Sequence, residues 1–292
     1  MTRDLSTRGT PEPRTTVVIP TVGRPSLVAL LDALAGGTRP VDCAVLVVDD
    51  RPRPADDLAA RLEYLRPWLP GLRVLRSGGG GPARARNLGW RHARTEWVSF
   101  LDDDVLPDAD WYDALLRDLG VACPGVAGSQ GAVRVPMPHG RRPTDWERTT
   151  SGLATATWIT ADLSYRRAAL AAVGGFDERF PRAYREDADL GLRVTGTQGD
   201  IVHGVRRVTH PVRPADDWVS VRQQAGNADD FLMSRLHGPD WRERCQAPTG
   251  RRRQHVATVG AGLVAAAAAL TGRRRTAWVG ALAWSASSAR FA

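Results

Sequence analysis

The sequence predicts an α/β protein with a doubly wound, mostly parallel central sheet. Short apolar runs alternate with helical patterns over the first hundred residues, as expected when strands are joined by crossover helices. The runs show no polar alternation, which is typical of strands buried on both faces. Ligands of such sheets bind beyond the carboxyl ends of the strands. Three of the runs end in polar segments, namely Pro20-Thr21, Asp49-Asp50 and Asp102-Asp103-Asp104.

The first half of the chain contains most of the predicted strands. Residues 1–14 are polar and contain proline, so we expect a loose leader and a first ordered residue at Thr15. Helix 26–34 is amphipathic, because leucines recur at helical spacing at positions 27, 30, 31 and 34. The patterns predict strands at 16–19, 44–48, 72–75 and 97–101, and helices at 26–34, 57–65 and 82–92.

The second half has shorter elements and is richer in Arg, Gly, Pro and Trp. We expect helices at 110–119, 166–173 and 187–195, and a strand at 158–163. These elements predict a smaller lobe on the same sheet rather than an independent domain. The organisation is then a leader (1–14), a first lobe (15–105), a second lobe of the same domain (106–215), a helical extension (216–253) and an apolar, arginine-flanked tail (254–292).

Composition excludes several classes of protein. The chain has 292 residues, of which 42% are hydrophobic and 25% charged, so it is neither largely disordered, nor collagen-like, nor a polytopic membrane protein. The three cysteines have no CxxC spacing, so we expect neither a zinc site nor a disulfide framework. The same cysteine usage indicates a reducing compartment. The N-terminal residues contain no apolar signal segment, and we expect a cytoplasmic protein.

The charge of the chain points to anionic partners. There are 40 basic residues, all of them arginine, against 32 acidic ones, which gives a net charge of +8. Nucleic acid, lipid headgroups and sugar nucleotides all fit this charge, and the charge alone does not choose between them.

Three consecutive carboxylates, Asp102-Asp103-Asp104, follow the predicted strand at 97–101. Like charges this close are unfavourable unless a cation neutralises them, and oxygen ligands suit Mg²⁺ or Mn²⁺ bound together with substrate phosphates. The sequence therefore predicts a divalent metal. The alternative is a solvated acidic turn or a cluster at the N-terminus of the next helix.

Three weaker signals accompany these carboxylates. Asp50 at a strand end is suited to a base edge or a ribose, but a plain turn explains it as well. The glycine run 78–81 precedes a basic helix, and backbone N–H groups at the start of such a helix favour a diphosphate. The alternative is a flexible loop in front of a basic helix face. Glu186 and Asp187 begin a predicted helix, either because the helix dipole favours acidic residues there or because one of them is a general base.

Six segments in order carry a family resemblance. They are Thr16-Val17-Val18-Ile19-Pro20-Thr21, Val47-Val48-Asp49-Asp50, Ala85-Arg86-Asn87-Leu88-Gly89, Phe100-Leu101-Asp102-Asp103-Asp104, Gly174-Gly175-Phe176-Asp177-Glu178 and Glu186-Asp187-Ala188-Asp189-Leu190. In this order they resemble family 2 glycosyltransferases of the GT-A fold, over roughly residues 15–215. The resemblance implies an inverting, metal-dependent transfer of a sugar from a nucleoside diphosphate sugar to an acceptor hydroxyl.

The resemblance also implies roles for individual residues. Asp187 is then the catalytic base, in a pair with Glu186. The metal, Mn²⁺ or Mg²⁺, is held by Asp104 and Asp102, with His210 as a further ligand. The donor nucleotide is bound by Pro20, Thr21, Gly23, Asp50, Arg86, Asn87, Asp102 and Asp103. The site for the acceptor and the donor sugar is shaped by Trp158, Gly174, Gly175, Phe176 and Asp177.

Two departures from the family pattern matter. Val22-Gly23-Arg24 follows the first Pro-Thr, where the family often has Tyr-Asn, so the contacts to the donor base differ. Residues 221–224 do not match the QxxRW signature of the processive synthases, which favours a single transfer. A nucleotidyltransferase, or a non-catalytic arginine-rich protein that binds lipid or nucleic acid, remains an alternative, with nucleic acid the less expected partner.

The tail has an apolar segment at 256–270 flanked by Arg251-Arg252-Arg253 and Arg273-Arg274-Arg275. Alanine dominates this segment, which at about 15 residues falls short of the roughly 20 needed to span a bilayer. We expect residues 251–292 to form a pair of helices. The pair either lies at an anionic surface on the cytoplasmic face of a membrane or packs on the body.

Overall fold

The computed structural model describes residues 14–216, 218–248 and 252–289. The chain divides into two compact units, Met1–Ala247 and Pro248–Ala292, which we name the body and the tail. The leader expected at residues 1–14 lies outside the described residues except for Arg14, and strand β1 begins at Thr15.

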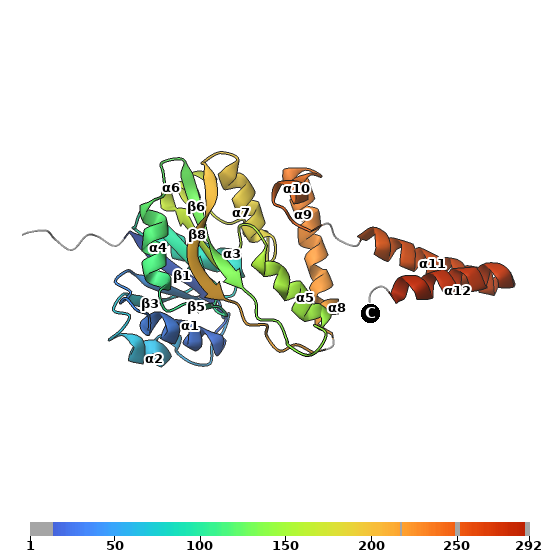
Figure 1. The fold of residues 1–292 in the computed structure, drawn as a ribbon, viewed down its shortest axis with the longest axis horizontal. Coiled ribbons are helices and arrows are strands. Elements are labelled where there is room, and N and C mark those ends of the chain that lie inside the picture. The colour runs from blue at the N-terminus through green and yellow to red at the C-terminus, as the bar shows by residue number, and fades with distance from the viewer. Residues whose placement is uncertain (1–13, 217, 249–251, 290–292) are drawn as a thin grey trace, which may run out of the picture. The chain divides into compact units, whose positions relative to one another are not determined.

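The body is built on an eight-stranded sheet with the order β3-β2-β1-β4-β7-β6-β8-β5 (Figure 1). The strands are β1 (Thr15–Thr21), β2 (Val45–Asp49), β3 (Leu72–Arg76), β4 (Trp97–Leu101), β5 (Leu106–Pro107), β6 (Val126–Arg134), β7 (Asp162–Arg166) and β8 (Asp200–Thr209). Strands β3, β2, β1 and β4 are parallel to one another, and β6 is parallel to β8. Strand β7 is antiparallel to β4 and β6, and β5 is antiparallel to β8. The predicted α/β class with a mostly parallel sheet is confirmed.

Helices cover both faces of this sheet. The helices of the body are α1 (Ser26–Ala35), α2 (Leu58–Leu62), α3 (Pro82–His92), α4 (Trp111–Gly120), α5 (Asp145–Ser151), α6 (Arg167–Val173), α7 (Glu186–Thr195), α8 (Val219–Gln223), α9 (Asn227–His237) and α10 (Trp241–Arg244), with short 3-10 turns at 63–65, 152–154 and 224–226. Successive residues of β1 point to opposite faces. Val17 and Ile19 pack with α1 and α4, whereas Val18 packs with α3, α6 and α7.

The second half of the body differs from the prediction. Strands β6 and β8 were not expected, and the strand expected at 158–163 is wrong, because β7 begins at Asp162. The reason is a buried ionic cluster. The Arg206 guanidinium of β8 is fully buried and donates to Asp162 and Asp118, at 2.7 and 3.0 Å, and to Ser129. Buried polar strand residues satisfied by a distant arginine leave no apolar run in the sequence.

The predicted helices fit the structure more closely. Helix α2 begins where Asp57 accepts a hydrogen bond from the backbone N–H of Ala59, a typical N-cap. The helix expected at 57–65 is shorter, since α2 ends at Leu62 and continues as a 3-10 turn. The extension carrying α9 and α10 belongs to the body: Met233 and Trp241 pack with Phe180, Ala188 and Leu192 in one core cluster.

The tail is a helical hairpin of α11 (Arg252–Leu270) and α12 (Arg274–Ser288). Small residues let the two helices approach closely: a Cβ atom added at Gly280 would lie 2.9 Å from the backbone N of Ala265. The expected pair of helices is thus present. Among the described residues, no helix combines the length and the apolar character needed to cross a bilayer.

Candidate functional site

The polar residues that follow β1 and β4 meet at one edge of the sheet. Asp103 is buried and accepts hydrogen bonds from the Thr21 hydroxyl at 2.6 Å and from the Arg24 guanidinium at 2.7 Å. The backbone N–H of Gly23 donates to the same Thr21 hydroxyl, at 2.9 Å. Gly23 has φ +79°, a left-handed conformation that favours glycine. Asp103 therefore fixes the loop between β1 and α1, and Pro20 lies within this strand end.

Asp50 organises the glycine loop that precedes α3. Its carboxylate accepts hydrogen bonds from the Ser77 hydroxyl at 2.6 Å and from the backbone N–H groups of Gly80 and Gly81 at 3.0 and 2.8 Å. The N–H of Gly79 donates to it as well, at 3.2 Å. These N–H groups are thus engaged by a carboxylate at the end of the neighbouring strand, which holds the loop that leads into α3.

Arg86 of α3 joins two carboxylates that lie far apart in the sequence. Its guanidinium donates to Asp102 and to Glu186, both at 2.7 Å, and it also lies 5.5 Å from the centre of the Phe176 ring. Burial alone would lower the pKa of Arg86, but the charges of Asp102 and Glu186 more than offset this and raise it. The Arg86 Nε and the second oxygen of Glu186 have no hydrogen-bond partner. This bridge ties the strand-end carboxylates to the start of α7.

The two carboxylates that begin α7 have raised pKa values. Burial and the nearby Asp187 charge raise the pKa of Glu186 to about 8, against the lowering effect of Arg86. Burial also raises the pKa of Asp187, although the backbone N–H of Ala188 donates to it at 2.7 Å. Carboxylates whose pKa values are raised in this way are suited to take up a proton.

Asp104 faces two nitrogen-bearing side chains from the segment after β8. His210 Nε2 lies 3.4 Å and Arg213 Nε 3.1 Å from its two oxygens. Burial, and next the charge of Asp102, raise the pKa of Asp104. His210 Nδ1 lies 3.2 Å from the Pro211 carbonyl, an acceptor. In the tautomer whose proton is on Nδ1, the lone pair of Nε2 faces Asp104, which is the orientation of a histidine that ligates a metal.

These residues are suited to a cation that is also coordinated by the substrate, rather than to a metal site made of protein ligands alone. No group of three or more His, Cys, Asp or Glu side chains placed to hold a metal is found in the described part of the chain. Mg²⁺ and similar ions are commonly held by one or two carboxylates and completed by substrate phosphates. Asp104, with His210 beside it and Asp102 nearby, meets that smaller requirement.

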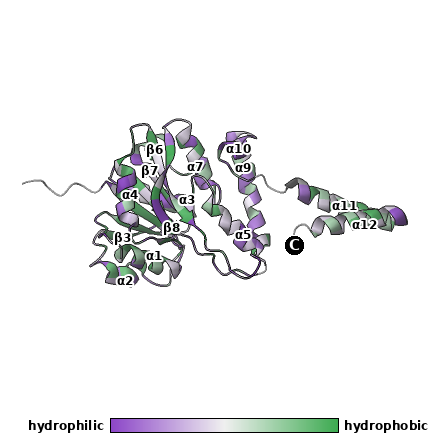
Figure 2. Cartoon of the chain, viewed as in Figure 1, coloured by the Kyte–Doolittle hydropathy of each residue, from purple (hydrophilic) through white to green (hydrophobic). Residues whose placement is uncertain are grey.

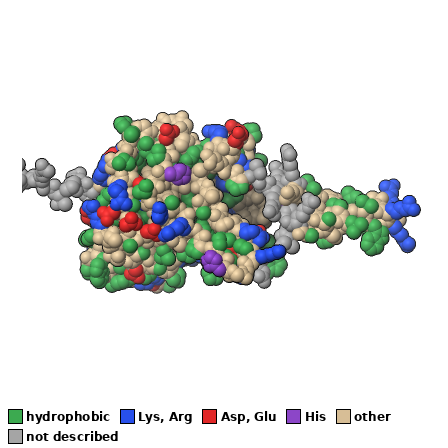
Figure 3. Space-filling view, viewed as in Figure 1, with side chains coloured by type: hydrophobic (Ala, Val, Ile, Leu, Met, Phe, Trp, Pro, Cys, Tyr) green, Lys and Arg blue, Asp and Glu red, His purple; other side chains and the backbone are tan. Residues whose placement is uncertain are grey.

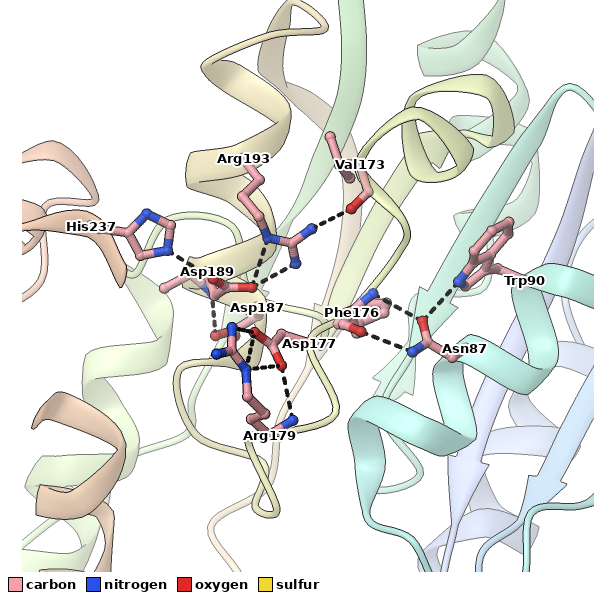
Figure 4. A network of polar contacts seen from close by, with 11 residues as sticks. Asn87, Trp90, Val173, Phe176, Asp177, Arg179, Asp187, Asp189, Arg193 and His237 are labelled. Carbon is pink, nitrogen blue, oxygen red and sulfur yellow. Dashed lines mark hydrogen bonds and ion pairs between the residues drawn. The ribbon is translucent and has the colours of Figure 1, made fainter. Parts of the chain in front are cut away.

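Asn87 connects α3 to the segment 174–178 (Figure 4). Its amide donates to the Phe176 carbonyl and to Glu178, at 2.9 and 2.8 Å, and its oxygen accepts from the Phe176 N–H and the Trp90 indole. A Cβ atom at Gly175 would lie 2.5 Å from both Asn87 Oδ1 and Trp90 Nε1. Asn87 is thus fully used in positioning this segment, which explains the glycine at 175.

A second network in Figure 4 connects α7 to the extension. Asp189 is buried and contacts His237 Nε2 of α9 at 2.7 Å and Arg193 at 2.6 Å.

The residues predicted for the acceptor and donor sugar have structural contacts of their own. Asp177 pairs with Arg179, which lowers the pKa of Asp177 against the effect of burial. Trp158 packs on α7, where a Cβ atom at Gly191 would lie 2.3 Å from the indole. Gly174 ends α6 in the left-handed conformation.

A pocket of about 470 Å³ lies next to the Asp104 cluster. It is lined by α5, by the residues before it and by the segment 212–220, and Arg213 belongs both to this lining and to the cluster. The Trp146 indole donates to the Arg213 carbonyl at 2.8 Å. The pocket therefore adjoins the strand-end site through one residue.

The fold and the site define the class of the protein. Parallel strands that end in carboxylates, an antiparallel β7 inserted beside β4, and a buried arginine joining the strand end to α7 make up a GT-A fold. The chain belongs to glycosyl transferase family 2, whose model matches residues 16–185.

Two curated relatives are similar in sequence to parts of this chain. It is 32% identical over 128 residues to the pre-mycofactocin glycosyltransferase of Mycobacterium tuberculosis, covering 39% of this chain and 26% of that protein. It is 25% identical over 255 residues to the O-antigen biosynthesis protein RfbC of Myxococcus xanthus, covering 73% and 19%. The chain thus spans about a quarter of these relatives or less.

The solved structures share the fold at low sequence identity. TarS 1–349 of S. aureus in complex with UDP-GlcNAc has a TM-score of 0.51 and 21% identity, covering 70% of this chain and 60% of that one. GalNAc-T7 with UDP, GalNAc and Mn²⁺ has a TM-score of 0.54 and 14% identity, covering 78% and 52%.

The structure brings most of the predicted site residues to one region. Asp102, Glu186 and Arg86 are in direct contact, and Asp104 contacts His210. Two contacts of site residues were not predicted. Arg213 at Asp104 had a signal, since it follows His210 by three residues. His237 at Asp189 had none, because the two side chains meet only through the packing of α9 on α7.

Proposed function

We propose that this chain is an inverting, metal-dependent glycosyltransferase that moves a sugar from a nucleoside diphosphate sugar to an acceptor hydroxyl. The buried Arg86 bridge between Asp102 and Glu186 is the observation that carries the proposal. It couples the carboxylates at the donor edge of the sheet to the acidic pair that begins α7, so the proposed base stands next to the proposed donor site. Membership of glycosyl transferase family 2 supports the same reaction class.

The donor nucleotide lies, in this proposal, along the edge formed by β1, β2 and β4. Asp50, with the glycine loop that it holds, contacts the base, and Asp102 lies nearer the ribose. The donor residues are Pro20, Thr21, Gly23, Asp50, Arg86, Asn87, Asp102 and Asp103, of which Asp103 and Asn87 act by holding the loops of the site. UDP-GlcNAc in the TarS structure and UDP in the GalNAc-T7 structure support a nucleotide-sugar donor.

The residues present fit a bound Mn²⁺ or Mg²⁺, and the GalNAc-T7 structure contains Mn²⁺. Asp104 and His210 would hold the ion, with Asp102 nearby. Such an ion, when bound, offsets the negative charge of the departing diphosphate. Arg213 is a further cation next to Asp104 and contributes to the same electrostatic balance.

Asp187 is the base of the proposed reaction. Its carboxylate takes the proton of the acceptor hydroxyl while that oxygen forms a bond to the anomeric carbon. The bond from that carbon to the diphosphate oxygen breaks, its electron pair leaves with the nucleoside diphosphate, and the configuration inverts. Glu186, joined to Arg86, holds the start of α7 in place, and burial keeps the pKa of Asp187 raised.

The acceptor enters, we propose, from the side of the pocket beside Asp104. Trp146 offers a flat apolar surface there, and Asp145 and Asp216 offer carboxylates. Among the described residues, the lining of the pocket has two arginines and three acidic residues, which disfavours an anionic acceptor and favours a neutral hydroxyl-bearing one. Trp158, Gly174, Gly175, Phe176 and Asp177 shape the other side, which faces the donor sugar.

A thermal-shift panel of nucleoside diphosphate sugars with and without Mn²⁺ tests the donor and the metal together. A saturating donor stabilises the folded state by about 2.7 kcal/mol at a hundredfold excess over Kd. The shift should depend on Mn²⁺ and should weaken in Asp104→Asn. Asp200→Asn, at the exposed opposite end of β8, is the control. A full set of donors with no metal-dependent shift would contradict the proposal.

Asp187→Asn tests the catalytic role by itself. The variant should bind the donor as the wild type does, as measured by the same shift, and should transfer no sugar. Normal turnover in this variant would show that the base is another residue. The anomeric configuration of the product, read by NMR, tests inversion.

We further propose that the enzyme works in the cytoplasm, at the cytoplasmic face of a membrane, with residues 251–292 as the attaching region. The cationic ends and apolar length of this region support that location. The transfer chemistry of the body does not depend on it.

A further inference from the structure

The hairpin of α11 and α12 leaves most of its apolar surface uncovered. Its large apolar side chains keep between 48% and 89% of their surface exposed, and Ala268 and Gly280 are the residues of the hairpin described as buried. The exposed side chains are Val256, Val259, Leu263, Val264, Leu270, Trp278, Val279, Leu282 and Trp284. Figure 2 shows this apolar character along both helices. A patch that is exposed and contiguous on this scale marks an interaction surface.

Helix α11 has no polar face that would suit it to water. Between Val256 and Leu270, Thr258 is the only side chain that carries a polar group. A helix that is apolar on all sides is normally enclosed by protein or lipid. One partner helix covers only one side of it. Something else must therefore cover the remainder of α11.

The charge of the tail indicates what that cover is. Residues 248–292 contain seven arginines and no acidic residue, so they hold +7 of the net charge of +8, and residues 1–247 hold only +1. The exposed Arg273, Arg274 and Arg275 gather at the turn of the hairpin (Figure 3). A second copy of this hairpin would oppose +7 with +7. An anionic lipid surface supplies the charge that complements these arginines.

The length of the helices decides how the hairpin meets the lipid. The apolar run from Val256 to Leu270 is about 22 Å long at 1.5 Å per residue, which is less than the hydrocarbon core of about 30 Å. A hairpin that crossed the bilayer would also carry three arginines to the far side. A hairpin that lies in the plane of one leaflet keeps the arginines of its turn, Arg273, Arg274 and Arg275, among the headgroups of that leaflet.

We infer that residues 252–288 form a membrane anchor that lies in the plane of one anionic leaflet without crossing it. Leu263, Leu282 and the two tryptophans enter the acyl region side-on. Tryptophans at such a boundary are favoured because the ring is apolar and the indole N–H remains hydrated. The inference specifies how the proposed location is achieved and does not depend on sugar transfer.

Flotation of the full-length protein with liposomes tests the anchor. The protein should float with vesicles of phosphatidylcholine and 30% phosphatidylglycerol and bind at least tenfold less to phosphatidylcholine alone. A Leu263→Ser, Leu282→Ser double variant should lose at least tenfold of the binding. The control is Ala266→Ser, Ala283→Ser, at exposed positions of the same two helices, which should bind like the wild type.

Two further measurements separate the competing covers. Sedimentation without lipid should give a monomer; a dimer that the Leu263→Ser, Leu282→Ser variant abolishes would show that a second copy covers the hairpin, and would overturn the inference. Trypsin added outside the vesicles should cleave bound protein at Arg273–Arg275. Protection of this turn, with the body still cleaved, would mean that the hairpin crosses the bilayer and would overturn the in-plane arrangement. Wild-type protein that never floats removes the membrane anchor, while donor binding tests the transferase separately.

Discussion

The Arg86 guanidinium lies 2.7 Å from the Glu186 carboxylate, and both side chains are buried. Glu186 stands a hundred residues further along the chain, so the contact exists only in the folded protein. It joins α3, which follows the glycine loop, to α7, which carries the proposed base.

Removing the guanidinium should destabilise the protein and stop transfer. Arg86→Met leaves Glu186 and Asp102 without their shared partner, and the loss of one member of a buried pair costs about 3 kcal/mol or more. Urea unfolding measures the change. Arg91→Met, an exposed residue of the same helix, should change stability by less than about 0.5 kcal/mol. Equal losses of unfolding free energy in the two variants would show that the buried contacts of Arg86 do not stabilise the fold.

Glu186 predicts a pH dependence of stability. Its pKa is about 8 in the folded protein against an ordinary value of 4.5, so the folded state binds the proton more tightly than the unfolded state does. Between these two values the free energy of unfolding should fall as the pH rises. Urea midpoints at pH 5, 6.5 and 8 measure the slope. Glu186→Gln should flatten it, and an unchanged slope in that variant would place the effect elsewhere.

Gly175 and Gly174 form a matched pair for a steric test. Both have φ near +79°, but a Cβ atom at Gly175 would lie 2.5 Å from Asn87 and Trp90, whereas nothing lies within 4 Å of one at Gly174. Gly175→Ala should therefore destabilise the protein by about 1–3 kcal/mol more than Gly174→Ala, because overpacking adds to the backbone strain. Thermal unfolding of the two variants measures the difference. Equal melting temperatures would show that the Asn87 network yields freely.

His237 should act on catalysis through α7. His237→Ala leaves one oxygen of the buried Asp189 without its partner, at a cost of about 1–3 kcal/mol, and loosens α9 from the helix that begins with the proposed base. We expect a lower kcat with little change in donor Kd. His203→Ala, at an exposed position of β8, is the control. An unchanged kcat would make the contact purely structural.

Trp146 tests the proposed acceptor pocket. Trp146→Ala should raise the acceptor KM at least tenfold, because the flat surface of the pocket is lost, while the donor-induced thermal shift stays as it is. Trp68→Ala changes an exposed tryptophan outside the pocket lining and should have no effect. If the donor shift fell instead, Trp146 would belong to the donor site.

The sequence by itself determined the parallel half of the sheet and the strand-end carboxylates. Strands β1, β2 and β4 consist of apolar runs buried on both faces, and such runs can be recognised from the local sequence alone. The tertiary structure decided β6, β7 and β8, because their buried polar groups depend on Arg206, which arrives from a distant part of the chain. The same holds for the site. Sequence motifs supplied Asp102, Asp187 and Arg86, whereas packing alone joined Arg86 to Glu186, His237 to Asp189 and Arg213 to Asp104. Local patterns report burial and helical period; pairing between charges depends on which surfaces the fold brings together.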